Sequence, residues 1–83
     1  MKITNVSVNK IEKEDSRYKG IATVILDDEI AIHGIRIIDG NKGLFIAMPS
    51  KKSNDDKYYD IVHPIKKEIR EMLEKVILDE YKR

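Results

Sequence analysis

The chain has 83 residues, of which 37% are charged and 41% are hydrophobic, and its formal net charge is +1. That length is enough for one domain, and the absence of cysteine excludes disulfides and thiolate metal sites. The N-terminal residues contain no apolar run as long as a signal peptide requires, and no later stretch approaches a membrane span. We therefore expect one cytoplasmic domain over residues 1–83, without membrane contact.

A domain of this size has a small core. It buries only about 60% of the surface that its unfolded chain exposes, and no disulfide compensates for the shortfall. Because a second copy can cover apolar surface that one chain leaves exposed, we expect a homodimer.

Alternating hydrophobic residues predict strands in the first half of the chain. Residues 2–11 place Val6 and Val8 on one face, which suits a strand. Residues 18–26 are largely apolar on both faces, which predicts a central strand. The three consecutive acids at 27–29 predict a tight turn into a third strand over residues 30–38.

The third strand changes phase in its middle. Ile30 and Ile32 share one face, whereas Ile35 and Ile37 have the opposite parity. An irregularity at His33-Gly34 restores the phase, and glycine inside a strand often marks a bulge. We interpret His33 as a residue that fills the strand face, with a functional side chain aimed by the bulge as the alternative.

A turn over residues 39–43, which contains two glycines, leads into a continuous apolar run. Such a run has to be covered on both faces, and a second subunit is a plausible cover. We therefore predict a dimer interface formed by Leu44, Phe45, Ile46, Ala47 and Met48. Residues 50–57 are expected to form a polar loop, and residues 58–62 a short fifth strand.

One helix is expected at the C-terminus. Pro64 suits the first helical position, where its missing N–H has no consequence, and the pattern continues to about Tyr81. Helical spacing produces one apolar stripe, formed by Ile65, Ile69, Met72, Leu73, Val76 and Ile77. The predicted fold is α+β, an antiparallel sheet of four to five strands with this helix packed on it.

Basic residues cluster at two places, Lys51-Lys52 in the polar loop and Lys66, Lys67 and Arg70 at the helix start. Lysines in a first helical turn oppose the macrodipole. A helix N-terminus with added lysines can hold a phosphate, although a small, tolerated penalty explains the placement equally well. If the loop folds back to the helix, the two clusters form one patch that binds nucleic acid through its phosphates.

The sequence offers little for catalysis. His33 and His63 are the only histidines, so no zinc or iron site is expected, and no phosphate-binding loop or dinucleotide fingerprint is present. The adjacent pair Ser50-Lys51 has no accompanying oxyanion motif. We expect no enzyme activity, no cofactor, no metal and no small-molecule substrate.

The whole chain resembles the stage V sporulation protein G (SpoVG) family of septation regulators. The matching stretches are Met1-Lys2-Ile3-Thr4-Asn5-Val6, Ile35-Arg36-Ile37-Ile38-Asp39-Gly40, Gly43-Leu44-Phe45-Ile46-Ala47-Met48-Pro49-Ser50-Lys51-Lys52 and Asp60-Ile61-Val62-His63-Pro64-Ile65. The resemblance implies a small α+β homodimer that binds DNA, with RNA as a second ligand, and that acts in gene expression, sporulation and septum formation.

In that family the basic residues after Pro-Ser are linked to nucleic-acid contact, and here those positions are Lys51 and Lys52. The following Ser53-Asn54-Asp55-Asp56-Lys57 is more acidic than a DNA-facing loop is expected to be. The alternative function is a protein-interaction adaptor in cell division that does not bind nucleic acid. It predicts that Leu44–Met48 and the acidic turn matter, whereas the lysines do not.

Overall fold

The computed structural model describes residues 2–83. Its main sheet is antiparallel in the order β1-β2-β3-β4. The strands are β1 (Ile3–Lys10), β2 (Tyr18–Leu26), β3 (Ile30–Gly40) and β4 (Gly43–Ala47). A second sheet pairs β5 (Ser50–Lys52) with β6 (Tyr58–Asp60), and α1 (Lys67–Tyr81) ends the chain. The predicted α+β class, the central position of β2 and the C-terminal helix are confirmed.

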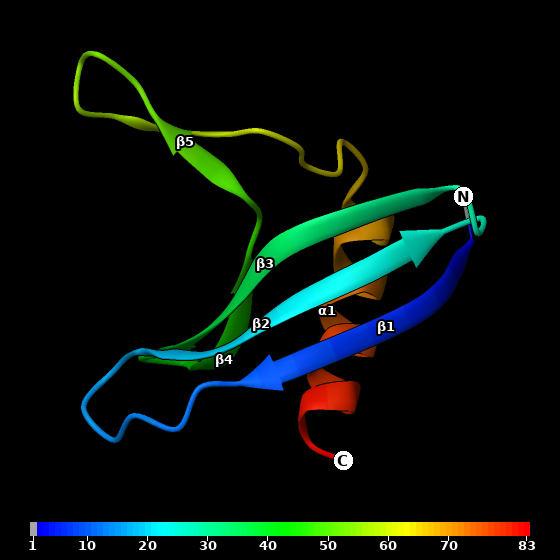
Figure 1. Cartoon of the computed structure of the whole chain (residues 1–83), viewed down its shortest axis with the longest axis horizontal. Coiled ribbons are helices and arrows are strands. Elements are labelled where there is room, and N and C mark those ends of the chain that lie inside the picture. The colour runs from blue at the N-terminus through cyan, green and yellow to red at the C-terminus, as the bar shows by residue number, and fades with distance from the viewer. Residues whose placement is uncertain (1) are drawn as a thin grey trace.

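The helix covers one face of the main sheet and leaves the other face uncovered. In Figure 1 the uncovered face is toward the viewer and α1 lies behind the strands. The core lies between sheet and helix and consists of Ala22, Val24, Ile35, Ile37, Ile46, Met48, Leu73 and Ile77. Burial of this apolar surface is the main force that holds the helix on the sheet.

The predicted bulge is present at the phase change of β3. Ala22 pairs with Ile35 and Val24 pairs with Ile32, so that two residues of β3 lie opposite one of β2. Gly34 has a φ of 80°, in the left-handed region that glycine adopts without strain. Because of the bulge, apolar residues on both sides of it reach the helix-covered face.

The helix begins later than the sequence predicted. Pro64 and Ile65 precede it, and Lys66 is the N-cap, with extended backbone angles (φ −109°, ψ 134°). Ile65 is therefore 89% exposed and does not belong to the apolar stripe, and Met72 is 44% exposed. The helical residues that are buried are Leu73 and Ile77.

The segment between sheet and helix also differs from the prediction. Residues 50–52 were expected in a loop, but they form β5. The expected fifth strand over residues 58–62 ends at Asp60 and pairs with β5 rather than with the main sheet. Together β5 and β6 form a hairpin that extends away from the sheet and the helix (Figure 1). Among residues 2–83 no helix is long and apolar enough to cross a membrane.

Candidate nucleic-acid interface

The β5–β6 hairpin is closed by a turn that Asp55 organises. Its carboxylate accepts hydrogen bonds from the Ser53 hydroxyl, from the Tyr59 hydroxyl at 3.3 Å and from the Lys57 amide at 3.4 Å. The Ser53 hydroxyl, followed by the Lys57 amide, holds the pKa of Asp55 below its ordinary value of 3.8. The next residue, Asp56, has a φ of 63°. The turn is therefore set by local side-chain hydrogen bonds, which are typical of Asp and Ser.

Lys51 and Lys52 are both exposed on this hairpin. Successive side chains of a strand point to opposite faces, so each face of the ribbon carries one of them. The Lys52 ammonium lies 3.5 Å from Oδ1 of Asp56. Over residues 50–60, three lysines are matched by three aspartates. The hairpin is thus formally neutral, and Lys52, one of the two lysines predicted to bind phosphate, already has an acidic partner.

The basic residues of the helix start are in part held by the fold. Lys66 is the exposed N-cap and makes no side-chain capping hydrogen bond. Lys67 Nζ lies 3.9 Å from Glu71 Oε1. Arg70 reaches back to the sheet and donates from Nη2 to the carbonyl oxygen of Ile46 at 3.1 Å. Arg70 therefore ties α1 to β4, in addition to any contact it makes with a ligand.

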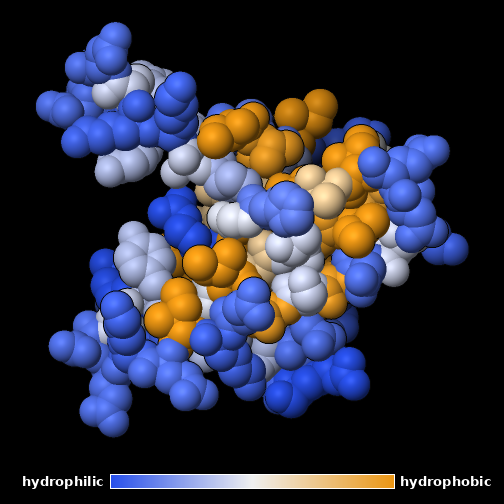
Figure 2. All heavy atoms as spheres, viewed as in Figure 1, coloured by the Kyte–Doolittle hydropathy of each residue, from blue (hydrophilic) through white to orange (hydrophobic). Residues whose placement is uncertain are grey.

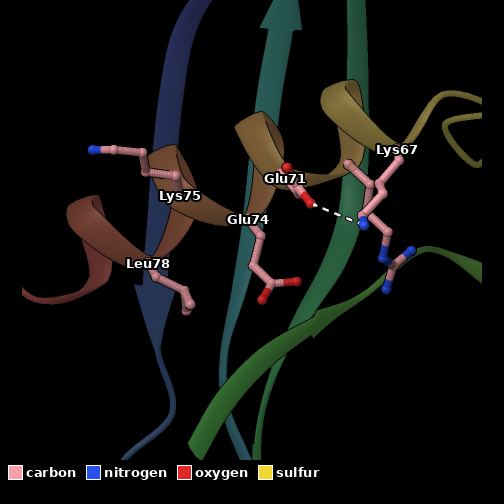
Figure 3. A pocket seen from close by; sticks show the side chains of 6 residues that line it. Lys67, Glu71, Glu74, Lys75 and Leu78 are labelled. Carbon is pink, nitrogen blue, oxygen red and sulfur yellow. Dashed lines mark ion pairs between the residues drawn. The ribbon is translucent and has the colours of Figure 1, made fainter.

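Acidic side chains alternate with basic ones along this side of the helix. Figure 3 shows Lys67 joined to Glu71 by an ion pair, with Glu74 and Lys75 farther along α1. These residues line a shallow cavity of about 450 Å³ together with Arg70 and Leu78. A mixed lining of this kind does not make a strongly positive surface, and it carries no anion site by itself.

The structure does not bring the two basic clusters together within one chain. Lys51 and Lys52 lie on the hairpin, which extends away from the helix start, where Lys66, Lys67 and Arg70 lie (Figure 1). The single patch that the sequence suggested required the loop to fold back, and the hairpin does not do so. The two clusters are separate candidate contacts.

The sequence interpretation missed Arg36, which fixes the base of the hairpin. Its Nη2 atom donates to the Met48 carbonyl oxygen at 3.3 Å and to Ser50 Oγ at 3.2 Å. Its guanidinium also lies 6.0 Å from the centre of the Tyr18 ring. A single arginine among the isoleucines of residues 35–38 was the available signal, because such a strand has little reason to hold a cation unless the cation has fixed partners.

Comparison with known proteins decides the family. The match to the SpoVG family extends over residues 1–83. The chain belongs to the SpoVG family. The resemblance noted from the sequence is thereby confirmed.

Several relatives within the SpoVG family are similar over nearly the whole chain. The protein named "Putative septation protein SpoVG" of Agathobacter rectalis is 48% identical over 82 residues, which are 99% of this chain and 93% of that protein. Its namesake in Lachnospira eligens is 47% identical over 83 residues, with coverage of 100% and 93%. "Putative septation protein SpoVG 2" of Listeria monocytogenes is 46% identical, with coverage of 100% and 80%.

Most of the segment predicted as the dimer interface of this SpoVG family member packs inside its own chain. Ile46 and Met48 are buried in the core, and Leu44 and Ala47 are half-buried. Phe45 is 38% exposed, and β4 is an edge strand whose outer backbone is not paired with another strand of the sheet. A homodimer contact through this segment therefore stays a prediction, and it would use the edge backbone of β4 rather than the buried side chains.

Proposed function

We propose that this chain is a non-enzymatic bacterial regulator that binds DNA through Lys51 and Lys52, with RNA as a second ligand. Membership in the SpoVG family and the names of the relatives support a role in septation and sporulation. The observation that carries the proposal is the position of both lysines, exposed on a hairpin that extends away from the protein body (Figure 1).

The shape of the hairpin supports this proposal. The major groove of B-DNA is about 12 Å wide and admits a two-stranded ribbon. Lys51 and Lys52 point to opposite faces of the ribbon, so each lysine would approach a different wall of the groove. Contacts of this kind position a protein on DNA through phosphates, and they carry no sequence information directly.

Self-association would double these contacts. A homodimer that joins through the β4 edge would present two hairpins, and four lysines would neutralise about four phosphates. The logarithm of the binding constant would then fall with the logarithm of salt concentration with a slope of about −3.6. Between about 50 and 200 mM salt this amounts to a loss of about 150-fold in affinity. Lys66 and Lys67 would add to the slope if a bent duplex reached the helix start.

The experiment is a fluorescence anisotropy titration of a labelled duplex at several salt concentrations. The Lys51→Ala/Lys52→Ala variant should lose most of the affinity and most of the salt dependence. The matched control is Lys75→Ala/Lys82→Ala, which removes the same charge from the C-terminal half of α1 and from the residue that follows it. If the hairpin variant binds as tightly as the parent at equal salt, the assignment of these lysines is wrong.

A second function, that of a protein-interaction adaptor, is favoured by a different surface. An apolar cavity of about 230 Å³ lies between the end of the sheet and the segment before α1, and Ile30, Ile32 and Val62 are among its lining residues. Exposed Ile61 and Ile65 belong to the same segment. Partner capture that survives nuclease treatment and fails in an Ile65→Ser variant would favour the adaptor. Capture that disappears with nuclease would favour the regulator.

A further inference from the structure

The face of the main sheet that α1 leaves uncovered carries two exposed aromatic side chains in one row. Tyr18 pairs with Ile38, and Ile38 pairs with Phe45, so the three residues lie side by side across β2, β3 and β4. Residues paired across antiparallel strands share a face. Tyr18 is 45% exposed and Phe45 is 38% exposed. Neighbouring strands lie about 4.8 Å apart, which places the two rings about 10 Å apart across the sheet.

A glycine provides the space against which Phe45 packs. A Cβ atom added to Gly40 would lie 2.7 Å from Cε1 and 3.1 Å from Cδ1 of the Phe45 ring. The ring therefore packs directly over the backbone of β3, in space that any other residue at position 40 would fill. The same ring is 38% exposed, so it is held against β3 and is also partly open to solvent.

This face carries one fixed positive charge, that of Arg36. The alternation of β1 to β4 places Arg36 and His33 on the uncovered face, and none of the strand residues on that face is acidic. A cavity of about 340 Å³ opens next to Tyr18, and it is lined by Ile11, Lys13, Ser16, Tyr18, Gly20, Ile21 and Arg36. The acidic residues of the adjoining loop, Glu12, Glu14 and Asp15, do not line it.

This face is continuous with the lysine hairpin. Arg36 lies over the Tyr18 ring and also donates to Ser50 Oγ, and Ser50 directly precedes Lys51. Cationic groups thus extend from the hairpin to the first ring of the aromatic row. Figure 2, which looks onto the uncovered face, shows hydrophobic atoms exposed between polar ones over the strands. Apolar rings beside cations on an open surface are what unpaired bases and their phosphates require.

We infer that the uncovered face of the main sheet is a second nucleic-acid site that stacks unpaired bases of a single strand on Tyr18 and Phe45. This inference rests on the proposed nucleic-acid function and assigns it a surface separate from the hairpin. Lys51 and Lys52 hold phosphates, Arg36 connects the two surfaces, and the cavity beside Tyr18 receives one base. The site is selective for unpaired bases because a duplex keeps the faces of its bases inside the stack.

The test measures the affinity of the protein for oligo(dT), for oligo(rU) and for a duplex, by fluorescence anisotropy at several salt concentrations. Tyr18→Ala and Phe45→Ala should each weaken single-strand binding by about 5- to 150-fold, the range for loss of one stacked base. They should leave the salt slope and the duplex affinity unchanged. Lys51→Ala/Lys52→Ala should instead lower the slope. The matched control is Ile65→Ala, which removes an apolar side chain that is 89% exposed and lies outside both the sheet and the hairpin. The two oligonucleotides show whether the strand is DNA or RNA.

A Tyr18→Trp variant gives an independent measurement, because the chain contains no tryptophan. Its single indole should keep single-strand affinity and lose fluorescence when a base stacks on it. Circular dichroism shows that each variant is folded.

Three outcomes would overturn the inference. The first is unchanged single-strand affinity in both alanine variants together with no quenching of the tryptophan. The second is an equal loss for duplex and single strand. The third is a change of oligomeric mass in Tyr18→Ala, which would make this face a contact between two copies of the chain.

If duplex binding and its dependence on Lys51 and Lys52 persist in these cases, the proposed function stands. If the parent binds none of the three nucleic acids, both proposals fail.

Discussion

Replacing Asp56 by Asn should strengthen DNA binding by the hairpin. Lys52 Nζ lies 3.5 Å from Asp56 Oδ1, and the two side chains are 56% and 87% exposed. An ion pair this exposed is worth about 0.2–1 kcal/mol, so release of Lys52 should raise the affinity of each hairpin about 1.4- to 5-fold. The number of lysines that meet phosphates does not change, so the salt slope should stay the same while the affinity rises.

Asn is the right substitute because Asp56 has a φ of 63°, and Asn adopts the left-handed region more readily than most residues do. Asp60→Asn is the matched control, because it removes a carboxylate from the same hairpin and leaves the Lys52–Asp56 pair in place. Anisotropy titrations of a labelled duplex across a salt series measure both variants. The reasoning is refuted if the two variants raise affinity equally, or if Asp56→Asn weakens binding.

Four further predictions concern stability. Ile77→Ala removes a fully buried side chain and should lower the free energy of unfolding by about 2–5 kcal/mol in urea titrations. Gly34→Ala meets no atom closer than 4.0 Å, so its loss of about 1–2 kcal/mol should come from the positive φ alone. Lys66→Asp supplies the missing N-cap and should raise the melting temperature, with a gain of about 0.5–2 kcal/mol. The pKa of Asp55 is lowered in the folded protein, so its carboxylate should stabilise the turn at pH values above 3.8, and this stabilisation should be lost as the pH falls below 3.8. The Lys57 amide signal in NMR spectra would report the loss.

The strands could be predicted because strand periodicity is strict. The opposite parity of Ile32 and Ile35 required one extra residue in β3, and glycine at position 34 identified the place. The end of the helix was equally clear. In β2 the pattern could not separate core from exposed residues, because both faces are apolar in sequence, whereas the structure buries Ala22 and Val24 and leaves Ile21 44% exposed.

The start of the helix could not be predicted because residues 61–67 contain no Ser, Thr, Asp or Asn that could cap it. Pro64 was the only marker, and proline is also common in the extended segment before a helix. Lys66 then takes an extended conformation without a side-chain cap. Ile69 is a residue of the first helical turn that packs against the core, and no local capping signal marks the residue at which α1 begins.

The hairpin was missed for a related reason. Ser-Lys-Lys has little β-propensity, so Ser50–Lys52 resembles a loop, and it becomes a strand because the turn organised by Asp55 sets its pairing with β6. Lys51 and Lys52 were therefore predicted as exposed, although the element that carries them was not. Arg36 was missed because its partners, the Met48 carbonyl and Ser50, are distant in sequence.

The candidate site has two parts, the β5–β6 hairpin and the main sheet, and they differ in how firmly tertiary contacts hold them. An isolated two-stranded hairpin is marginally stable in water, and all three residues of β6 are exposed, so few tertiary contacts hold its outer end. Its base is different, because Arg36 binds both the chain before β5 and the first residue of that strand. The outer end of the hairpin has few tertiary contacts, so its lysines are expected to adjust as they meet phosphates, whereas the sheet face holds its aromatic row before any ligand arrives. Since Arg36 contacts both parts, ordering of the hairpin by a phosphate backbone would also steady the guanidinium over Tyr18.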